Sequence, residues 1–438
     1  MKLLRLLPIL TFILLADAAV ADRVRPGKVR KLLQRSEVMS KHHVGFALYD
    51  LDKRKLIYGH QDDKYFTPAS NTKLFTFYAG LKMLRDSIPG LQYIERGDSL
   101  FFWGTGDPSL LHPDVEEQPV IGKLRGAGKH LVLSGGRFTG DFYGPGWSYD
   151  DYNEYYQPEI AGFPVWGNVV RFSNVQGQIT PNVKSAGFRF ETDSLRRTGS
   201  FRVRRDFFFN NFRSPLVAAA PSYRQEVPFK YSLALAAELL EDTIGREIVL
   251  SDRLPDAQYL RTWYSVPKDS LFRRMLLPSD NFIAEQLLLT YAAESGLEMN
   301  AQSVIDHVVK QFLADLPDKP QWVDGSGLSR QNLFTPRSMV KLCEKIYDEF
   351  ATKEGQLFHL LPQGGKTGTI RNLYKSESAP FVFAKTGSLS NVHNLTGYLI
   401  TKDGKRLIFS FMNNGYTVPT SDIRKEMERI LTIIHQEN

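Results

Sequence analysis

The sequence predicts a mixed α/β protein of more than one domain, in which the first fold along the chain is interrupted and later completed. The chain has 438 residues, enough for two or more domains, with 42% hydrophobic and 24% charged residues. Strand and helix patterns occupy residues 43–85 and return in the last third of the chain. Residues 86–255 are rich in Gly, Pro and aromatic residues, which indicates inserted β-rich material.

The first 21 residues have the pattern of a secretory signal peptide. Lys2 and Arg5 precede an apolar stretch from Leu6 to Leu15, and Ala19-Val20-Ala21 is a small-residue cleavage site. This apolar stretch is shorter than the about 20 residues that a membrane span needs. We therefore expect an exported protein without a stable membrane span.

Composition argues against several other classes of function. The formal net charge is +7, but no run of Lys and Arg stands beside a nucleic-acid motif, so no nucleic-acid partner is expected. The single cysteine, Cys343, leaves no cysteine pair for an internal disulfide or for zinc, and the chain has no H-E-x-x-H motif. We expect no metal and no other cofactor. An exported chain with one cysteine is compatible with a bacterial periplasm.

The first fold begins with two strands and a helix. His43–Tyr49 alternates in polarity, and Lys55–Gly59 follows a polar turn. Thr67-Pro68 is expected to open a helix, because proline suits the first helical turn. The spacing of its apolar residues predicts one buried face. These residues are Leu74, Phe75, Tyr78, Leu81 and Leu84.

The interrupting region is expected to contain a second, smaller unit. Lys129–Leu133 and Phe188–Thr192 alternate as strands do, and Tyr231–Glu241 has helical periodicity. These changes of pattern predict four parts. They are a signal peptide at 1–21, a catalytic domain of 22–85 and 256–438, an inserted domain of 86–168 and 227–255, and a nested small domain of 169–226.

The last third is expected to complete the first fold. Asn281–Ser295 is predicted to be a helix and Phe381–Ala384 a strand, and Leu395–Ile400 and Arg406–Met412 are predicted strands joined by an Asp-Gly turn. A terminal amphipathic helix follows, and core packing is favoured over a membrane-surface anchor because its polar face is mixed in charge. Its apolar positions are Ile423, Met427, Ile430, Leu431 and Ile434.

Three short segments in a fixed order carry the candidate chemistry. They are Ser70-Asn71-Thr72-Lys73, Ser279-Asp280-Asn281 and Lys385-Thr386-Gly387. Together they supply a nucleophile, a lysine able to take its proton, a polar relay and a cationic anchor for a carboxylate. A serine hydroxyl is a weak nucleophile until a base activates it, and burial favours the neutral, basic form of a lysine. The same motif set occurs in class A β-lactamases and penicillin-binding proteins.

Each segment also has a less specific interpretation. S-x-x-K recurs at 265–268 and 338–341, but the first copy lies too close to Ser279 for an intervening helix and the second comes after it. The second K-T-G copy, Lys366-Thr367-Gly368, lacks the upstream glycine of a phosphate loop, so we expect a turn there. The residue types of the Ser279 triplet also suit a helix N-cap, and a capping role is compatible with a catalytic role.

With these segments placed, the chain resembles the low-molecular-mass class C penicillin-binding proteins, the D-alanyl-D-alanine carboxypeptidase/endopeptidases of peptidase family S13. Three further stretches carry the resemblance: Gly104-Thr105-Gly106-Asp107-Pro108, Gly144-Pro145-Gly146-Trp147 with Asp150-Asp151, and Asp324–Arg330. The resemblance runs from about residue 30 to the C-terminus. It implies a serine β-lactamase/transpeptidase-like α/β/α sandwich with a β-rich inserted domain and a smaller nested domain.

The resemblance also implies a role for each motif residue. Ser70 would be the nucleophile and Lys73 its base, Ser279 would relay a proton, and Asn281 would position the substrate. Lys385, Thr386 and the Ser388 hydroxyl would bind a terminal carboxylate, and the backbone N–H groups of Ser70 and Ser388 would form an oxyanion hole. Gly387 is expected to let the substrate backbone approach closely. Asp151 and Arg330 would contact the free end of a diaminopimelate side chain.

The expected activity is that of a periplasmic serine DD-carboxypeptidase/DD-endopeptidase. It would cleave D-alanine-containing bonds in the stem peptides and cross-links of peptidoglycan through an acyl-enzyme at Ser70, with β-lactams as inhibitors. Two alternatives remain open. A β-lactamase needs a dedicated base for deacylation, and no Glu-x-x-x-Asn follows Asn281 within a few tens of residues. A non-catalytic wall-binding protein could retain the fold, although every catalytic residue type is present.

Overall fold

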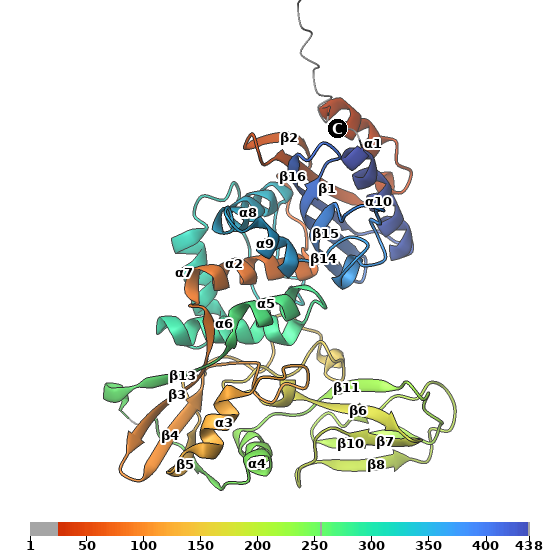
Figure 1. Ribbon diagram of the computed structural model, residues 1–438. Helices are drawn as coiled ribbons and strands as arrows, with labels where there is room; N and C mark the ends of the chain where they lie inside the picture. The colour runs from red at the N-terminus through yellow and green to blue at the C-terminus, as the bar shows by residue number, and fades with distance from the viewer. Residues whose placement is uncertain (1–24, 255, 437–438) are drawn as a thin grey trace, which may run out of the picture.

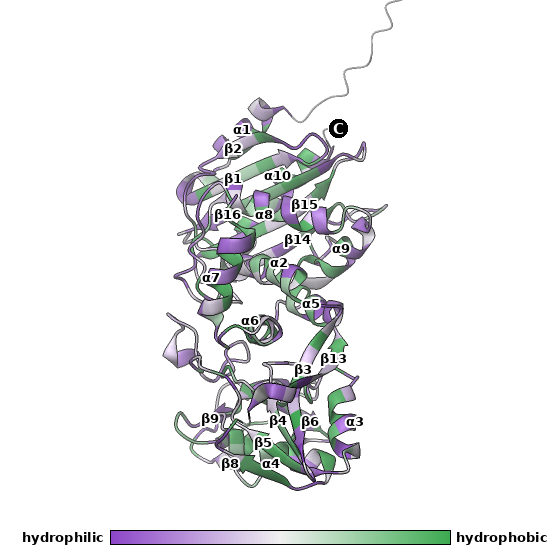
Figure 2. Cartoon of the chain, turned by 90° about the vertical axis from the view of Figure 1, so that its left-hand side faces the viewer, coloured by the Kyte–Doolittle hydropathy of each residue, from purple (hydrophilic) through white to green (hydrophobic). Residues whose placement is uncertain are grey.

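The computed structural model describes residues 25–254 and 256–436. The molecule is elongated, with a helix-covered sheet at one end, a β-rich part at the other, and helix α6 (Asn281–Ser295) between them (Figures 1 and 2). The predicted signal peptide at 1–21 lies outside the described residues. Among the residues that are described, no helix combines the length and the apolar character that crossing a membrane requires.

A five-stranded antiparallel sheet with the order β14-β15-β16-β1-β2 is built from both ends of the chain. Its strands are β1 (His43–Asp50), β2 (Lys55–His60), β14 (Val382–Leu389), β15 (Val392–Ile400) and β16 (Arg406–Asn414). β1 pairs with β16, with His43 opposite Asn414 and Asp50 opposite Leu407. All five predicted strands of this sheet are confirmed, and the first fold is indeed completed by the last third of the chain.

Helices cover both faces of this sheet (Figure 1). Alternate residues of one strand point to opposite faces, so Phe46 and Leu48 join the core under one helical layer and Ala47 joins the core under the other. The first layer is α1 (Pro26–Gln34) and α10 (Thr420–Gln436). The second contains α2 (Lys73–Met83), α5 (Lys268–Leu276), α6, α7 (Ala301–Phe312), α8 (Pro336–Glu349) and α9 (Glu354–Leu360). The presence of α5 between Ser265 and Ser279 corrects the expectation that no helix fits there, because its nine residues begin directly at Lys268. This layering confirms the predicted α/β/α sandwich.

The terminal helix α10 packs as the sequence predicted. All five of its predicted apolar positions are buried in the core between the helix and the sheet: Ile423, Met427, Ile430, Leu431 and Ile434. Because the apolar face is covered by the sheet, it has no free surface for a membrane.

Helix α2 differs from the prediction in two ways. It begins at Lys73, and Ser70 lies in the 3₁₀ turn η2 (Ala69–Thr72) that precedes it. One buried face was expected, but every residue from Lys73 to Gly80 is buried. The reason is that α5, α6 and α8 all contact α2, so it lies inside the helical layer and not on its surface.

The inserted part contains a second five-stranded sheet with the order β12-β5-β4-β3-β13. Its strands are β3 (Ser87–Arg96), β4 (Ser99–Gly104), β5 (His130–Ser134), β12 (Ile248–Ser251) and β13 (Arg261–Pro267), and α3 (Pro119–Gly126) and α4 (Leu233–Ile244) accompany it. Because β13 pairs with β3, this sheet extends past the predicted boundary between residues 255 and 256. The predicted boundary therefore falls between two strands of one sheet, β12 and β13, and the division of the chain there remains a prediction.

Two three-stranded sheets occupy the region that the sequence assigned to a nested domain. Their orders are β11-β6-β7 and β8-β10-β9. The strands are β6 (Val169–Val175), β7 (Gln178–Pro181), β8 (Arg189–Asp193), β9 (Arg204–Arg205), β10 (Asn211–Pro215) and β11 (Arg224–Pro228). Their buried residues, such as Phe172 and Phe212, share one core with Leu131 of β5 and Leu240 of α4. The nested and inserted parts are therefore packed together, and their division into domains remains a prediction.

The core position of α2 predicts a large cost for truncating its aromatic residues. Phe75 is fully buried and stacks on Phe334, with ring centroids 4.2 Å apart. We expect Phe75→Ala to lower the free energy of unfolding by about 3–5 kcal/mol, because it removes a buried ring and leaves a cavity. Urea unfolding followed by tryptophan fluorescence measures this change. Leu195→Ala is the control, because Leu195 is 92% exposed and its loss should stay within about 0.5 kcal/mol. Equal losses in the free energy of unfolding for the two variants would contradict the core position of Phe75.

Candidate active site

One cleft of about 1220 Å³ brings the three sequence motifs together. The predicted site residues that line it are Ser70, Asp151, Ser279, Asn281, Arg330, Thr386 and Ser388. Lys73 and Lys385 are fully buried just behind this lining, where each contacts one of the cleft serines. These nine residues therefore lie at one site, and Gly387 lies against the Ser70 turn beside them. They come from α2, α6, β14, two 3₁₀ segments and two loops.

The turn that carries Ser70 is held in place by two glycines from other parts of the chain. A Cβ atom at Gly387 of β14 would lie 2.2 Å from the carbonyl oxygen of Pro68, and one at Gly327 would lie 1.9 Å from that of Ala69. Side chains at these positions would displace the backbone around the nucleophile. The Ser70 turn fills the space that a side chain of Gly387 would occupy, and the expected approach of a substrate backbone to this glycine remains a prediction. Ala69 itself has a positive φ of 48°, a strained conformation next to the nucleophile.

Lys73 makes three short contacts from the start of α2. Its Nζ atom lies 3.0 Å from Ser70 Oγ, 2.7 Å from Asn281 Oδ1 and 2.8 Å from the carbonyl oxygen of Ser326. Burial lowers the pKa of Lys73 to about 8, against the opposing influence of the Glu285 and Asp324 carboxyl groups. Roughly a tenth of this lysine is therefore neutral at pH 7, far more than of a lysine with the ordinary pKa.

The geometry leaves the lone pair of neutral Lys73 for Ser70. A neutral amine has two N–H groups and one lone pair, and the carbonyl of Ser326 can only accept. The amide of Asn281 also accepts here, because its Nδ2 donates to the carbonyl of Tyr156 at 3.1 Å and its oxygen therefore faces Lys73. Once both N–H groups are used on these oxygens, the remaining direction is that of the Ser70 hydroxyl. Lys73 is thus oriented to take the proton of Ser70.

Lys385 contacts Ser279, the second serine of the cleft, as Lys73 contacts Ser70. Its Nζ atom lies 2.8 Å from Ser279 Oγ, and burial, with the nearby charge of Lys73, lowers its pKa well below the ordinary value. Ser279 has a positive φ of 67°, which turns it out of the helix direction just before α6. The neighbouring Asp280 caps α6 by accepting from the Ile283 N–H at 2.9 Å. The cap interpretation of this triplet is therefore confirmed for Asp280, while the catalytic interpretation of Ser279 remains a prediction.

Two residues that the sequence analysis did not single out connect the motifs. Asn71 donates from Nδ2 to the carbonyl of Lys385 at 2.5 Å, which ties the Ser70 turn to β14. Thr369 accepts from the Thr386 hydroxyl at 2.7 Å and lines the cleft. Thr369 follows the second K-T-G copy, which forms the predicted turn, with the 3₁₀ segment η6 (Gly368–Ile370). That copy thus lies beside the first, a proximity that sequence spacing could not reveal.

Two buried carboxyl groups behind Lys73 form a further part of the site. Glu285 of α6 accepts from the backbone N–H groups of Gly325 and Ser326, at 2.9 and 2.7 Å. Asp324 accepts from Ser329 N–H and from Trp147 Nε1. Burial raises the pKa of both. By holding the 324–329 loop, Glu285 directs the Ser326 carbonyl at Lys73. The signal for Glu285 was a charged residue four positions after Asn281, between the apolar residues 282–284 and 287–289.

The two residues assigned to substrate recognition lie at the cleft but have different surroundings. Asp151 belongs to the 3₁₀ segment η3 (Tyr149–Asp151), and burial with the neighbouring Asp150 and Glu154 raises its pKa, although a hydrogen bond from Tyr156 opposes this. Arg330 donates from Nη2 to the carbonyl of Ser390 at 3.0 Å, so its position is fixed from the β14–β15 turn. Their contacts with a substrate remain predictions.

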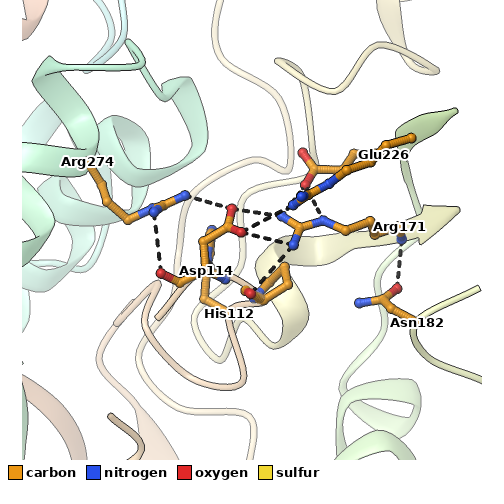
Figure 3. Close-up of polar contacts among 8 residues, drawn as sticks. His112, Asp114, Arg171, Asn182, Glu226 and Arg274 are labelled. Atoms are coloured by element: carbon orange, nitrogen blue, oxygen red, sulfur yellow. Dashed lines mark hydrogen bonds and ion pairs between the residues drawn. The ribbon is translucent and has the colours of Figure 1, made fainter. Parts of the chain in front are cut away.

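An ion network fixes the far wall of the cleft (Figure 3). The Asp114 carboxylate accepts hydrogen bonds from Arg171 of β6 at 2.7 Å and from Arg274 of α5 at 2.6 Å. The Glu226 carboxylate of β11 accepts another from Arg171 at 2.8 Å. Partial burial opposes ionisation of Asp114, but the arginines lower its pKa to about 2. Asp114 thus joins the nested strands to the helical layer that carries the catalytic groups.

These features fit one class of site: a serine acyl-transfer site in which a buried lysine, and not a histidine, lies within hydrogen-bonding distance of the candidate nucleophile. A family model described as "D-Ala-D-Ala carboxypeptidase 3 (S13) family" matches residues 26–195 and 223–435. The chain belongs to this family and is a serine-type D-Ala-D-Ala carboxypeptidase.

Individual relatives agree with this assignment over most of the chain. The D-alanyl-D-alanine carboxypeptidase DacB of Haemophilus influenzae is 26% identical over 446 aligned positions, covering 90% of each chain. The D-alanyl-D-alanine carboxypeptidase of an Actinomadura species is 25% identical, covering 86% of this chain and 78% of that one. The crystal structure of penicillin-binding protein 4 from H. influenzae has the same fold, with a TM-score of 0.73, 21% identity, and coverage of 93% of this chain and 99% of that one.

The close contact at Gly387 predicts that activity is sensitive to a single methyl group. Gly387→Ala would force β14 away from Pro68 and the Ser70 turn, because backbone atoms cannot yield as a flexible side chain can. We expect acylation of Ser70 by benzylpenicillin to slow by at least about tenfold, a barrier change of about 1.4 kcal/mol, as measured by stopped flow. Gly355→Ala is the matched control, since nothing lies within 4 Å of a Cβ there, and it should react at the native rate. A native rate for Gly387→Ala would contradict this packing argument.

Proposed function

We propose that this carboxypeptidase hydrolyses D-alanine-containing bonds of peptidoglycan stem peptides through an acyl-enzyme at Ser70, and that it also cleaves cross-links as an endopeptidase. The observation that carries this proposal is the position of Lys73 Nζ, 3.0 Å from Ser70 Oγ with its N–H groups directed at Asn281 and Ser326. This supports proton abstraction by Lys73 as Ser70 attacks.

The proposed reaction has two halves. Ser70 Oγ bonds to the carbonyl carbon while its proton passes to Lys73, and the negative charge on the carbonyl oxygen is met by the N–H groups of Ser70 and Ser388. The C–N bond then breaks, and the leaving amine takes a proton relayed through Ser279. In the second half, water attacks the ester, the acyl group leaves as a carboxylic acid, and Ser70 regains its proton.

Recognition of the substrate's terminal carboxylate is assigned to Thr386, Ser388 and the buried Lys385. The two hydroxyl groups line the cleft, and Lys385 lies behind them. Ser388 Oγ lies 2.8 Å from His393 Nδ1, and burial lowers the pKa of His393 to about 3, so this imidazole is neutral. The positive charge at this place therefore comes from Lys385. A bound carboxylate favours the protonated form of this lysine, which is otherwise disfavoured by burial. Asp151 and Arg330 are assigned to the diaminopimelate side chain.

Two features support cleavage of cross-links in addition to terminal residues. The cleft, at about 1220 Å³, has room for more than a single peptide end. A predatory peptidoglycan endopeptidase from Bdellovibrio bacteriovorus has a related fold, with a TM-score of 0.51 and 14% identity, covering 90% of this chain and 93% of that one. We place the enzyme in a bacterial periplasm, on the signal-peptide pattern at residues 1–21.

The same serine should react with β-lactams, as penicillin-binding protein 4 of H. influenzae has been solved in complex with one. Incubation with benzylpenicillin should add the mass of the intact drug to the native protein and none to Ser70→Ala. Ser265→Ala and Ser338→Ala, which remove the other S-x-x-K serines, should keep the adduct. Turnover of a D-Ala-D-Ala peptide by Ser70→Ala should fall by a factor on the order of 10⁶.

The alternative functions give other results in the same intact-mass measurement. Rapid loss of the drug without a lasting adduct would indicate a β-lactamase. An intact drug with no adduct on the native protein would indicate a non-catalytic wall-binding protein.

The lowered pKa of Lys73 predicts the pH dependence of acylation. Lowering this pKa from 10.5 to about 8 raises the neutral fraction at pH 7 from roughly 0.03% to roughly 10%. Only neutral lysine accepts a proton, so the acylation rate should rise about tenfold per pH unit below pH 8 and level off above it. Stopped-flow acylation between pH 6 and pH 9.5 measures the profile.

A pair of variants tests whether Lys73 is the titrating group. Lys73→Arg should abolish acylation across this range, because a guanidinium stays protonated. Lys82→Arg, near the exposed C-terminal end of α2 in an ion pair with Glu349, should leave the profile unchanged. A flat native profile would contradict the role of Lys73 as base.

A further inference from the structure

A second cavity adjoins the catalytic cleft. Its volume is about 530 Å³, and it shares Tyr155 and Glu226 with the cleft lining. Its walls are the segments 153–155, 200–202 and 223–226. The middle segment belongs to residues 196–222, which the S13 family model does not match. One wall of the cavity is therefore formed by a part of the chain that the general features of the family do not account for.

Three aromatic rings line this cavity, one of them exposed and two partly buried. Tyr155 is 64% exposed, at the border between the cavity and the cleft. Phe201 and Tyr223 also line the cavity; they are partly buried and pack edge to face with centroids 4.7 Å apart, which fixes both rings in the wall. Exposed aromatic faces of this kind bind the C–H face of a sugar ring, because both surfaces are apolar and flat.

The charges that line the cavity cancel. Glu154 and Glu226 oppose Arg202 and Arg224, with Arg202 paired to Glu154. Each arginine has five N–H donors, and one of its terminal nitrogens contacts a carboxylate. For Arg224 this carboxylate is that of Asp114, at 3.2 Å. The wall therefore offers donors and acceptors without net charge. Hydroxyl and acetamido groups, which both donate and accept, fit this lining better than an anionic peptide arm.

We propose that this cavity binds the glycan part of the substrate, an N-acetylated amino sugar unit to which the stem peptide is attached. The inference deepens the proposed function and rests on it: a stem peptide bound at Ser70 continues into its sugar, and the second cavity adjoins the cleft. The network around Asp114 keeps the two spaces in a fixed relation, because Arg274 comes from the catalytic helices while Arg171 and Glu226 come from the nested strands (Figure 3).

The test compares kcat/KM for a free stem pentapeptide and for the same peptide carrying a disaccharide. We expect the native enzyme to prefer the disaccharide-peptide by about tenfold or more, the effect of one or two good contacts. Arg202→Met removes a wall donor and Ser200→Trp fills the space; both should bring the ratio near one and leave free-peptide hydrolysis unchanged. Arg204→Met is the matched control, since Arg204 lies on the same domain outside the cavity, and it should keep the native ratio.

Direct binding of the peptide-free disaccharide, measured by calorimetry, separates this inference from the proposed function. Binding to the native protein that is lost in Arg202→Met supports the glycan site even if neither peptide is hydrolysed and benzylpenicillin does not acylate Ser70. Hydrolysis of both peptides with a native ratio near one overturns the glycan site and leaves the proposed function standing. The glycan site is also overturned if both cavity variants keep the native preference in kcat/KM for the disaccharide-peptide.

Discussion

The burial of Lys73 is the constraint on which the catalytic structure depends. An amine without solvent loses part of its preference for the charged form, and only then can it serve as a base near neutral pH. Burial also requires that its N–H groups find acceptors, and Asn281 and the Ser326 carbonyl supply them. Those acceptors come from α6 and from the 324–329 loop. The positions of both elements are therefore part of the chemistry of Ser70.

Close backbone packing holds the Ser70 turn in place on the side away from Lys73. Gly327 and Gly387 let a loop and β14 approach the Ser70 turn to distances that no side chain would allow. β14 can be there because the sheet is completed by strands from the C-terminal third, beside β1 from the N-terminal part. The site is thus assembled by long-range pairing, and no continuous segment of the chain contains it.

The inserted and nested strands form the far side of the cleft and the second cavity. Their attachment to the catalytic helices runs through Asp114, which is held by arginines from both sides. Partly buried ion pairs of this kind contribute modestly to stability, but their fixed geometry specifies how two parts of a protein are oriented. This part of the molecule is where the substrate beyond the reacting peptide bond would be recognised.

The sequence by itself determined the order of the elements and predicted which groups react. The strands of the main sheet, α6 and the buried face of α10 followed from local periodicity, and the three motifs named Ser70, Lys73, Ser279, Asn281 and Lys385. Tertiary structure decided what depends on contacts between distant segments. It placed β13 in the inserted sheet, buried α2 on all sides, gave Gly387 a packing role, and brought Glu285 and Thr369 to the site. A periodic pattern reports one helix or strand, whereas burial and lowered pKa values arise from neighbours far away in the chain.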